Sequence, residues 1–223
     1  MSDIIIAARG GLAAKSRLAD VLDAPNRAAL TAAMLEAMLW SLRAWSDAPR
    51  VCVVTPCAEL AELGPRYGAH ITLQHANDGL NAAFDQARAE IAAERGDSLI
   101  ALLPGDLPLL APGELQQLFD LAAAHDVALA PASSDGGTGA IVLRAGTDFP
   151  SLFGPNSFAR HEAAAKARNL SRAALGLASL GLDIDRPPDL IALAARMHVL
   201  PQFLQRRFAQ IIRTARQRSR VAS

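Results

Sequence analysis

Short apolar runs alternate with longer amphipathic stretches over most of this chain. The runs are rich in valine, isoleucine and leucine, as buried strands are, and they lie at residues 3–8, 50–55, 69–73, 99–103, 127–130 and 141–143. Amphipathic stretches at residues 23–45, 58–63, 79–94 and 112–124 predict helices between them. Strands that alternate with helices pair in parallel. The chain is therefore predicted to be a single-domain α/β protein, with a mainly parallel central sheet and helices on both faces.

The pattern changes in the last third of the chain. A helix is expected from Ser157, an apolar run at residues 177–182 predicts a last strand, and Pro187 starts another helix. From residue 199 onward there are arginines but no acids, with an incomplete apolar stripe from Phe203 to Ile212. We expect a globular domain over residues 1–198 and a basic C-terminal helix or tail over 199–223, docked on the domain and frayed at its end. A dimer contact or binding to an anionic surface are the alternatives for this segment.

Composition narrows the classes of protein. Of the 223 residues 51% are hydrophobic, which is typical of a packed globular chain, and 22 basic residues balance 22 acidic ones. A neutral chain has no overall attraction to nucleic acid or membrane, so neither is expected as a partner. No apolar run is long enough to span a bilayer, and the N-terminus lacks the pattern of a signal peptide. Cys52 and Cys57 fit no common zinc pattern, so free thiols and a cytoplasmic location are expected.

The apolar run at 99–103 ends in a proline, a glycine and then the lone carboxylate Asp106. Open α/β sheets bind their ligands at the carboxyl ends of central parallel strands, which is where this residue is expected to lie. The alternative is an aspartate that only forms a turn or caps a helix. Asp106 is therefore a candidate catalytic residue whose role depends on what other strand ends contribute.

Cations and glycines follow the first predicted strand. Arg9, Lys15 and Arg17 lie within nine residues with no acid among them, and Gly10 and Gly11 let the backbone approach an anion. Together these five residues can cradle a triphosphate. The spacing matches neither a Walker loop nor the dinucleotide fingerprint, and a solvated basic loop is the alternative.

A helix start carries a second nucleotide-binding candidate. Gly79 and Asn81 open the helix at 79–94, where a side-chain amide can read a base edge or a ribose. The alternative is an ordinary helix start capped by Asp78 or Asn77.

Two aspartates, Asp183 and Asp185, close the run at 177–182. Alternate residues of an extended segment share a face, so their carboxylates are expected to point the same way and to repel each other unless a cation lies between them. Oxygen ligands beside phosphates favour Mg²⁺ over zinc, although many such pairs are surface turns.

Two small-residue segments are further candidates. The loop at 131–140 contains Thr138 among glycines and suits either a hairpin or a backbone that approaches a ligand. Ser157 follows Gly154 and is expected to cap the next helix, whose exposed N–H groups can hold an anion. His161 has no partner histidine at ligand spacing, which favours a packing or hydrogen-bonding role over metal binding.

Several of these motifs occur in the order found in one known family. The segments 15–18, 79–81, 103–108, 136–138 and 153–157 with His161, and Asp183-Ile-Asp185 with Pro187 and Asp189, resemble the 2-phospho-L-lactate guanylyltransferase family over roughly residues 4–192. That family makes the guanylylated phospholactate, phosphoenolpyruvate or phosphoglycerate intermediate of coenzyme F420 biosynthesis.

The resemblance implies a single-domain nucleotidyltransferase fold of the GT-A type. It also implies Mg²⁺ bound by Asp106, Asp183 and Asp185, and an acceptor acid near Thr138, Gly154 and Ser157. The chain departs from the family in two places. Ala7-Ala8-Arg9 replaces Pro-Val-Lys, and Gly137-Thr138-Gly139 replaces Gly-Thr-Asn, which leaves the identity of the acceptor open.

The expected activity is transfer of GMP from GTP to a phosphorylated three-carbon acid with release of pyrophosphate. Asp106, Lys15, Asp183 and Asp185 are the expected catalytic residues, with positioning and charge neutralisation as their means. The alternatives are a related transferase acting on molybdopterin or a sugar phosphate, and a catalytically silent nucleotide-binding protein. A homodimer is left open.

Overall fold

The computed structural model describes residues 2–45, 49–74, 78–133 and 136–221, with the side chains of residues 216 and 219–221 excepted. The predicted cap Asn77 and the loop residues Ser134 and Asp135 lie outside these ranges. Within the described chain, one seven-stranded sheet has the order β3-β2-β1-β4-β6-β5-β7. The strands are β1 Ser2–Ala7, β2 Arg50–Thr55, β3 His70–Leu73, β4 Leu99–Pro104, β5 Val127–Pro131, β6 Thr138–Arg144 and β7 Arg172–Ala174.

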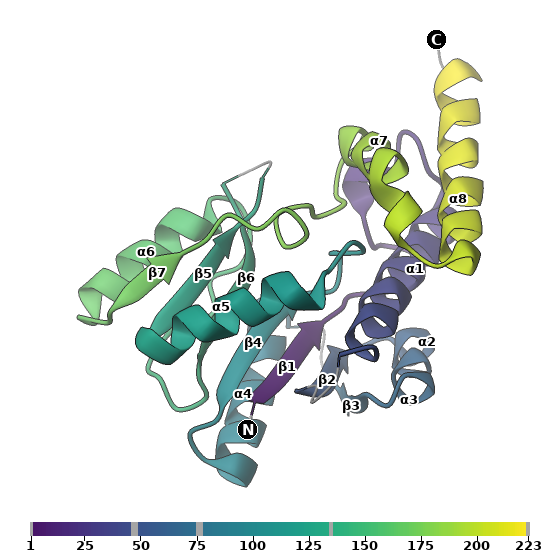
Figure 1. Cartoon of the computed structure of the whole chain (residues 1–223). Helices are drawn as coiled ribbons and strands as arrows, with labels where there is room; N and C mark the ends of the chain where they lie inside the picture. Colours follow the sequence, from purple (N-terminus) through teal and green to yellow (C-terminus); the bar gives the residue numbers. More distant parts are fainter. Residues whose placement is uncertain (1, 46–48, 75–77, 134–135, 222–223) are drawn as a thin grey trace.

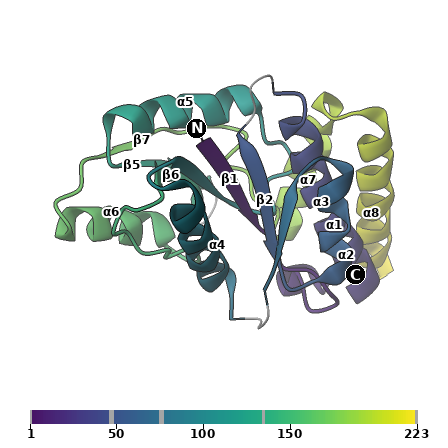
Figure 2. The ribbon, with the colours of Figure 1, turned by 90° about the horizontal axis from the view of Figure 1, so that it is seen from below.

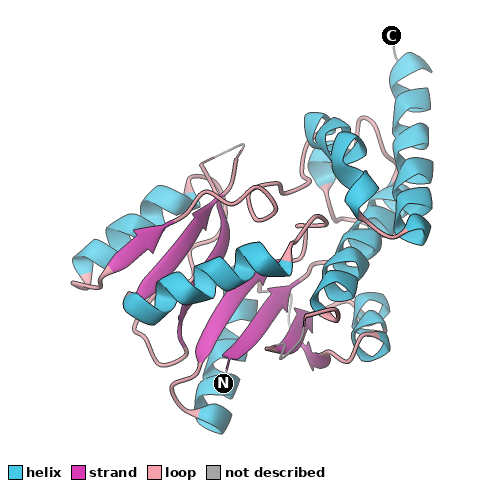
Figure 3. Cartoon of the chain, viewed as in Figure 1, coloured by secondary structure: helices cyan, strands magenta, loops and turns pink. Residues whose placement is uncertain are grey.

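Strand β6 runs antiparallel to its neighbours β4 and β5, and the other pairings in the sheet are parallel. Helices cover both faces of this sheet (Figures 1 and 2), as predicted from the alternation of elements. One face packs against α1 Ala24–Leu42, α2 Ala58–Ala61, α3 Leu63–Arg66 and α5 Pro112–Ala124. The other face packs against α4 Leu80–Arg95 and α6 Ser157–Ala167. Figure 3 shows the strands gathered between these helical layers.

Helix α1 is buried on two sides, because a third layer of helices packs on the side that faces away from the sheet. Its second face packs against α7 Pro187–Arg196 and α8 Gln202–Val221, and these two helices are joined through the 3₁₀ turn η2 Met197–Val199. Leu204 and Phe208 of α8 are fully buried there, whereas Phe203 stays about half exposed. Burying such side chains contributes roughly 1.5–3 kcal/mol each, so the basic segment docks through its apolar stripe. Among the described helices, none combines the length and hydropathy needed to cross a bilayer.

The prediction of a last strand at residues 177–182 is wrong. This segment is a turn and irregular backbone, in which Gly181 N–H donates to Leu177 O at 2.8 Å. Leu177 and Leu180 are buried in the core against the sheet, and Leu182 is buried in the layer formed by α1, α7 and α8. The apolar pattern of this segment therefore indicated burial and not a strand. The edge strand is β7 instead, which pairs in parallel with β5. Its Arg-Ala-Ala sequence has no β-branched residue that could have indicated a strand.

A polar cluster ties elements together at the amino end of the sheet. Asp3 on β1 is fully buried, and its carboxylate accepts hydrogen bonds from Arg50 at 2.8 Å, Arg95 at 2.8 Å and Ser98 at 3.1 Å. Arg50 also reaches the exposed Glu94. The cluster links β1 to β2, to the end of α4 and to the start of β4, far from the carboxyl ends of the strands.

Candidate functional site

The site is built where β1 and β4 end side by side. Ala7 pairs with Pro104 in the parallel ladder, and the N–H of Gly105 donates to Ala7 O at 2.9 Å. A side chain at position 105 would not fit, since a Cβ there would lie 2.7 Å from the Cβ of Ala8. The glycine thus lets the chain leaving β4 pass against the loop after β1. This brings Asp106 next to the cationic loop.

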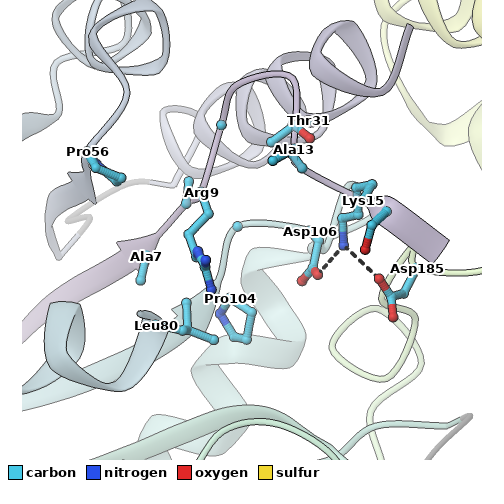
Figure 4. Close-up of a pocket in the computed structure, with 15 residues that line it drawn as sticks. Ala7, Arg9, Ala13, Lys15, Thr31, Pro56, Leu80, Pro104, Asp106 and Asp185 are labelled. Carbon is cyan, nitrogen blue, oxygen red and sulfur yellow. Dashed lines mark hydrogen bonds and ion pairs between the residues drawn. The ribbon is translucent and has the colours of Figure 1, made fainter. Parts of the chain in front are cut away.

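Two of the three predicted aspartates meet around one ammonium group. Lys15 Nζ lies 2.6 Å from Asp106 Oδ2 and 3.8 Å from Asp185 Oδ1, as the dashed lines in Figure 4 show. Arg17 forms a second ion pair with Asp185. The backbone supports this meeting, because the N–H of Ile184 donates to Asp106 O at 3.2 Å. Two segments far apart in the chain are therefore linked by a main-chain hydrogen bond and, through Lys15, by charge.

The electrostatics leave room for a further cation. Burial disfavours the charged form of Lys15, but Asp106, Asp185 and Asp183 outweigh that effect, so the pKa of Lys15 is raised and the ammonium stays charged at neutral pH. Asp106 Oδ1 is buried and has no hydrogen-bond partner, a costly state that a bound cation would relieve. In the described part of the chain no three His, Cys, Asp or Glu side chains yet converge as a ready-made metal site.

Two adjoining cavities share this cluster of charges. The first has a volume of about 350 Å³ and is lined by Arg9, Gly10, Lys15, Asp106 and Asp185 among others. Figure 4 shows Arg9 extending from the loop after β1 toward Pro104 and Leu80. The second cavity, of about 360 Å³, also contains Lys15, Asp106 and Asp185 in its lining. Volumes of this size are typical of small-molecule sites.

The second cavity joins the charged cluster to neutral hydrogen-bonding groups. Asp183 and Arg17 line it together with Thr138, Gly154 and Ser157, so the three predicted acceptor-binding residues lie in one place. The Ser157 hydroxyl donates to Thr138 Oγ1 at 3.2 Å, and both side chains are nearly fully buried.

His161 holds this neutral half in position. Its Nδ1 lies 2.9 Å from Thr138 Oγ1, and its Nε2 accepts a hydrogen bond from the N–H of Leu152 at 2.9 Å. The ring is fully buried between Phe149 and Phe153. Burial and, secondarily, the charge of Arg160 lower the pKa of His161 to about 4, so the imidazole is neutral at pH 7. A packing and hydrogen-bonding role, as the sequence indicated, is confirmed.

Three predicted nucleotide-binding residues, Gly11, Gly79 and Asn81, line neither cavity. The side chain of Asn81 is engaged by protein, since it accepts from the N–H of Phe153 at 2.8 Å and donates to Phe153 O at 3.3 Å. Gly79 precedes α4 with a φ of 96°, and the neighbouring Leu80 lines both cavities. Gly11 has a φ of 83° in the loop after β1. Asn81 thus couples the start of α4 to the segment that carries Gly154.

The loops at 131–140 and 153–157 differ from the sequence-based picture in detail. Strands β5 and β6 form a hairpin, and Gly139 does sit at a close backbone approach. The group that approaches Gly139 is a backbone carbonyl of the protein and not a ligand, because a Cβ at Gly139 would lie 1.7 Å from Leu180 O. Ser157 is not the N-cap of α6, since that position is Asn156 in a left-handed conformation. The N–H groups of Ser157 and Phe158 are taken by the carbonyls of Gly154 and Gly136.

Comparison with known proteins agrees with this architecture. Residues 2–206 match the family described as "Guanylyl transferase CofC like". The chain is 45% identical over 196 residues to a 3-phospho-D-glycerate guanylyltransferase of Phenylobacterium zucineum, covering 87% of this chain and 90% of that one. It is 37% identical over 186 residues to a phosphoenolpyruvate guanylyltransferase of Sphaerobacter thermophilus, covering 83% and 89%.

Solved structures of low sequence identity share the fold. A putative nucleotide-diphospho-sugar transferase from Desulfovibrio desulfuricans G20 superimposes with a TM-score of 0.74 at 17% identity, covering 97% of each chain. A nucleotidyl transferase from Methanothermobacter gives a TM-score of 0.62 at 16% identity, covering 89% of this chain and 97% of that one. On the strength of the family match and of the two relatives, this chain belongs to the CofC-like guanylyl transferase family.

Proposed function

We propose that this protein transfers GMP from GTP to a phosphorylated three-carbon acid and releases pyrophosphate, as a step of coenzyme F420 biosynthesis. One observation carries the proposal: the charged residues Lys15, Arg17, Asp106 and Asp185 line one cavity together with the neutral hydroxyl side chains of Thr138 and Ser157. The cationic side chains suit a triphosphate, and the hydroxyl side chains suit a small acid. The names of the two relatives, which refer to 3-phosphoglycerate and phosphoenolpyruvate, support the choice of acceptor.

The reaction asks for positioning more than for covalent chemistry by the protein. An oxygen of the acceptor phosphate attacks the α-phosphorus of GTP in line and forms the new P–O bond. The bond from that phosphorus to the oxygen bridging the α- and β-phosphates breaks, and pyrophosphate leaves with the electron pair. The acceptor phosphate already ionises near neutral pH, so no general base is required of the side chains lining the cavities.

The cationic side chains would bind the phosphates of GTP. Arg9, Lys15 and Arg17 would hold the β- and γ-phosphates and the departing pyrophosphate, with Gly10 and Gly11 letting the backbone come close. Gly79 and Asn81 would face the nucleoside from the start of α4, with Asn81 acting through its clamp on Phe153.

The carboxylates suit a hard divalent cation. Asp106, Asp183 and Asp185 would hold Mg²⁺, which fits the unpartnered Oδ1 of Asp106 and the oxygen-only donor set. When bound, Mg²⁺ would supply charge neutralisation between the acceptor phosphate and the α-phosphate.

A pyrophosphate-release assay tests the proposal. The purified protein is incubated with GTP and Mg²⁺ and, in parallel, with 2-phospho-L-lactate, phosphoenolpyruvate or 3-phosphoglycerate. We expect release that requires one of these acids, with CTP replacing GTP poorly. Turnover only with a sugar phosphate or a pterin would favour a related transferase, and GTP binding without any turnover would favour a silent nucleotide-binding protein.

A further inference from the structure

The three acceptor-side residues depend on a single buried imidazole. His161 contacts Thr138 through Nδ1 and fixes the backbone at Leu152, two residues before Gly154, through Nε2. Ser157 lies one helical turn before His161 on α6 and bonds to Thr138. A change in the hydrogen-bonding state of this ring therefore reaches every residue expected to hold the acceptor acid.

The partners of the ring define its tautomer. The main-chain N–H of Leu152 can only donate, so Nε2 of His161 must carry a lone pair. A neutral imidazole then has its proton on Nδ1, and Nδ1 donates to Thr138 Oγ1. Ionisation does not disturb this arrangement at neutral pH, because burial and Arg160 hold the pKa of His161 down at about 4.

The tautomer decides what the two hydroxyls can offer a ligand. Thr138 and Ser157 together carry two O–H protons, and one of these is used in the hydrogen bond between them. Because His161 donates, neither hydroxyl has to give it a proton, and the second O–H remains available. With an accepting nitrogen in the same place, Thr138 would donate to the ring and Ser157 to Thr138, and only lone pairs would face the cavity.

We propose that His161 is a positioning residue that makes the Thr138–Ser157 pair a hydrogen-bond donor to an anionic oxygen of the acceptor acid. The inference rests on the proposed function, because the acid is the ligand of this cavity. A pair restricted to lone pairs would repel a carboxylate or phosphate oxygen, whereas a preset O–H donor in a buried site forms a charge-assisted bond. Within the described residues no other group accepts that remaining proton, and both hydroxyls line the cavity.

The tautomer can be read without any turnover. Long-range ¹H–¹⁵N spectra of the histidine-labelled protein, with the His161 signals assigned by their loss in His161→Gln, report which nitrogen carries the proton. We expect Nδ1 protonated and Nε2 unprotonated from pH 5 to pH 8. A proton on Nε2, or a doubly protonated ring at pH 7, would overturn the proposal.

Two variants separate positioning from general support of the fold. In His161→Asn the amide can still donate at the place of Nδ1, whereas in His161→Gln it reaches the place of Nε2 and leaves Thr138 without its donor. Loss of one hydrogen bond to a charged oxygen predicts that KM for the acid rises about tenfold or more in His161→Gln, and by less than about threefold in His161→Asn. The KM for GTP should stay within about twofold of the wild-type value in both variants.

The hydroxyl and a nearby control complete the test. Thr138→Val should raise the KM for the acid as His161→Gln does, and combining the two changes should add little further. Ser151 lies on the same loop as Leu152, and Ser151→Ala removes its partly buried hydrogen bond to Asp85 of α4, so both KM values should stay unchanged. Equal losses in His161→Asn and His161→Gln, or a parallel rise in KM for GTP, would reduce His161 to a structural residue. Absence of turnover by the wild type with all three acids would count against the proposed function alone, since the spectra judge His161 separately.

Discussion

Asp3 and Asp106 are aspartates at opposite ends of neighbouring strands, and the protein treats them in opposite ways. Asp3 lies at the amino end of β1, fully buried, with its carboxylate satisfied by Arg50, Arg95 and Ser98. Asp106 follows the carboxyl end of β4, where one oxygen pairs with Lys15 and the other is buried without a partner. Fixed donors satisfy the carboxylate of Asp3. The carboxylate of Asp106 keeps one oxygen without a hydrogen-bond partner, and it lies beside two cavities.

The difference separates a carboxylate that the fold satisfies from one that we propose acts in the site. A buried carboxylate that is fully paired contributes to holding elements together, and removing it strands the cations around it. A carboxylate with a buried, unpartnered oxygen lowers the stability of the free protein. Such a group is favourable only when a cation or another ligand binds to that oxygen. Four measurements test whether the two aspartates differ in this way.

The largest effect is expected from Asp106→Asn. Replacing the carboxylate by an amide removes the charge that would be shared with the cation and with Lys15, so pyrophosphate release should fall by about 1,000-fold, equivalent to about 4 kcal/mol. The free energy of unfolding should fall by less than in Asp3→Asn, because Asp185 and Asp183 still face Lys15 and one oxygen of Asp106 is already unsatisfied. Steady-state assays and urea titrations of this variant, with the exposed Asp120→Asn as control, measure both quantities. Near-normal turnover would remove Asp106 from the mechanism.

Asp3→Asn should show the reverse pattern. Losing the buried charge leaves Arg50 and Arg95 without their shared partner and should lower the free energy of unfolding by about 3 kcal/mol. Activity per folded molecule should be unchanged, because the cluster lies at the far end of the sheet. Glu94→Gln is the matched control, since it removes the exposed partner of Arg50 and should cost less than about 1 kcal/mol. Equal costs for the two variants would contradict a structural role for Asp3.

The buried, neutral His161 gives a third case, because it makes the free energy of unfolding depend on pH. The pKa of His161 is lowered to about 4 in the folded protein, so between pH 6.5 and 4 the unfolded chain binds a proton that the folded chain does not. Stability therefore falls as the pH falls, by about 2 kcal/mol from pH 7 to pH 5 for this residue alone. Urea titrations at the two pH values should show a decrease that is smaller by this amount in His161→Asn. An identical pH dependence in both proteins would mean that His161 titrates normally.

The smallest expected effect is that of the cation itself. If the orphaned oxygen of Asp106 helps to hold Mg²⁺, the metal binds the folded protein and stabilises it by about 1.4 kcal/mol at ten times its Kd. Thermal unfolding with increasing MgCl₂, at constant ionic strength, measures this shift. Asp106→Asn should lose it, and Asp3→Asn should keep it. A shift that persists in Asp106→Asn would place the cation elsewhere.

Much of the architecture was determined by the sequence alone. The strands at 50–55 and 99–103, the helix at 112–124 and the mainly parallel sheet follow from local apolar periodicity, which short segments carry by themselves. The location of the site was also predictable, because the carboxyl ends of parallel strands always meet at one edge of the sheet. Lys15, in the loop after the first predicted strand, and Asp106, directly after the fourth, come together for this reason.

The tertiary structure alone decided how those residues are used. Asn81 was a candidate base reader, yet its amide bonds to the backbone of Phe153, and Gly139 makes room for the carbonyl of Leu180. The segment at 177–182 is buried without being a strand, and the donating nitrogen of His161 is set by an N–H nine residues earlier. Such outcomes depend on which backbone groups become neighbours after packing, and a pattern of side chains along one chain does not contain that information.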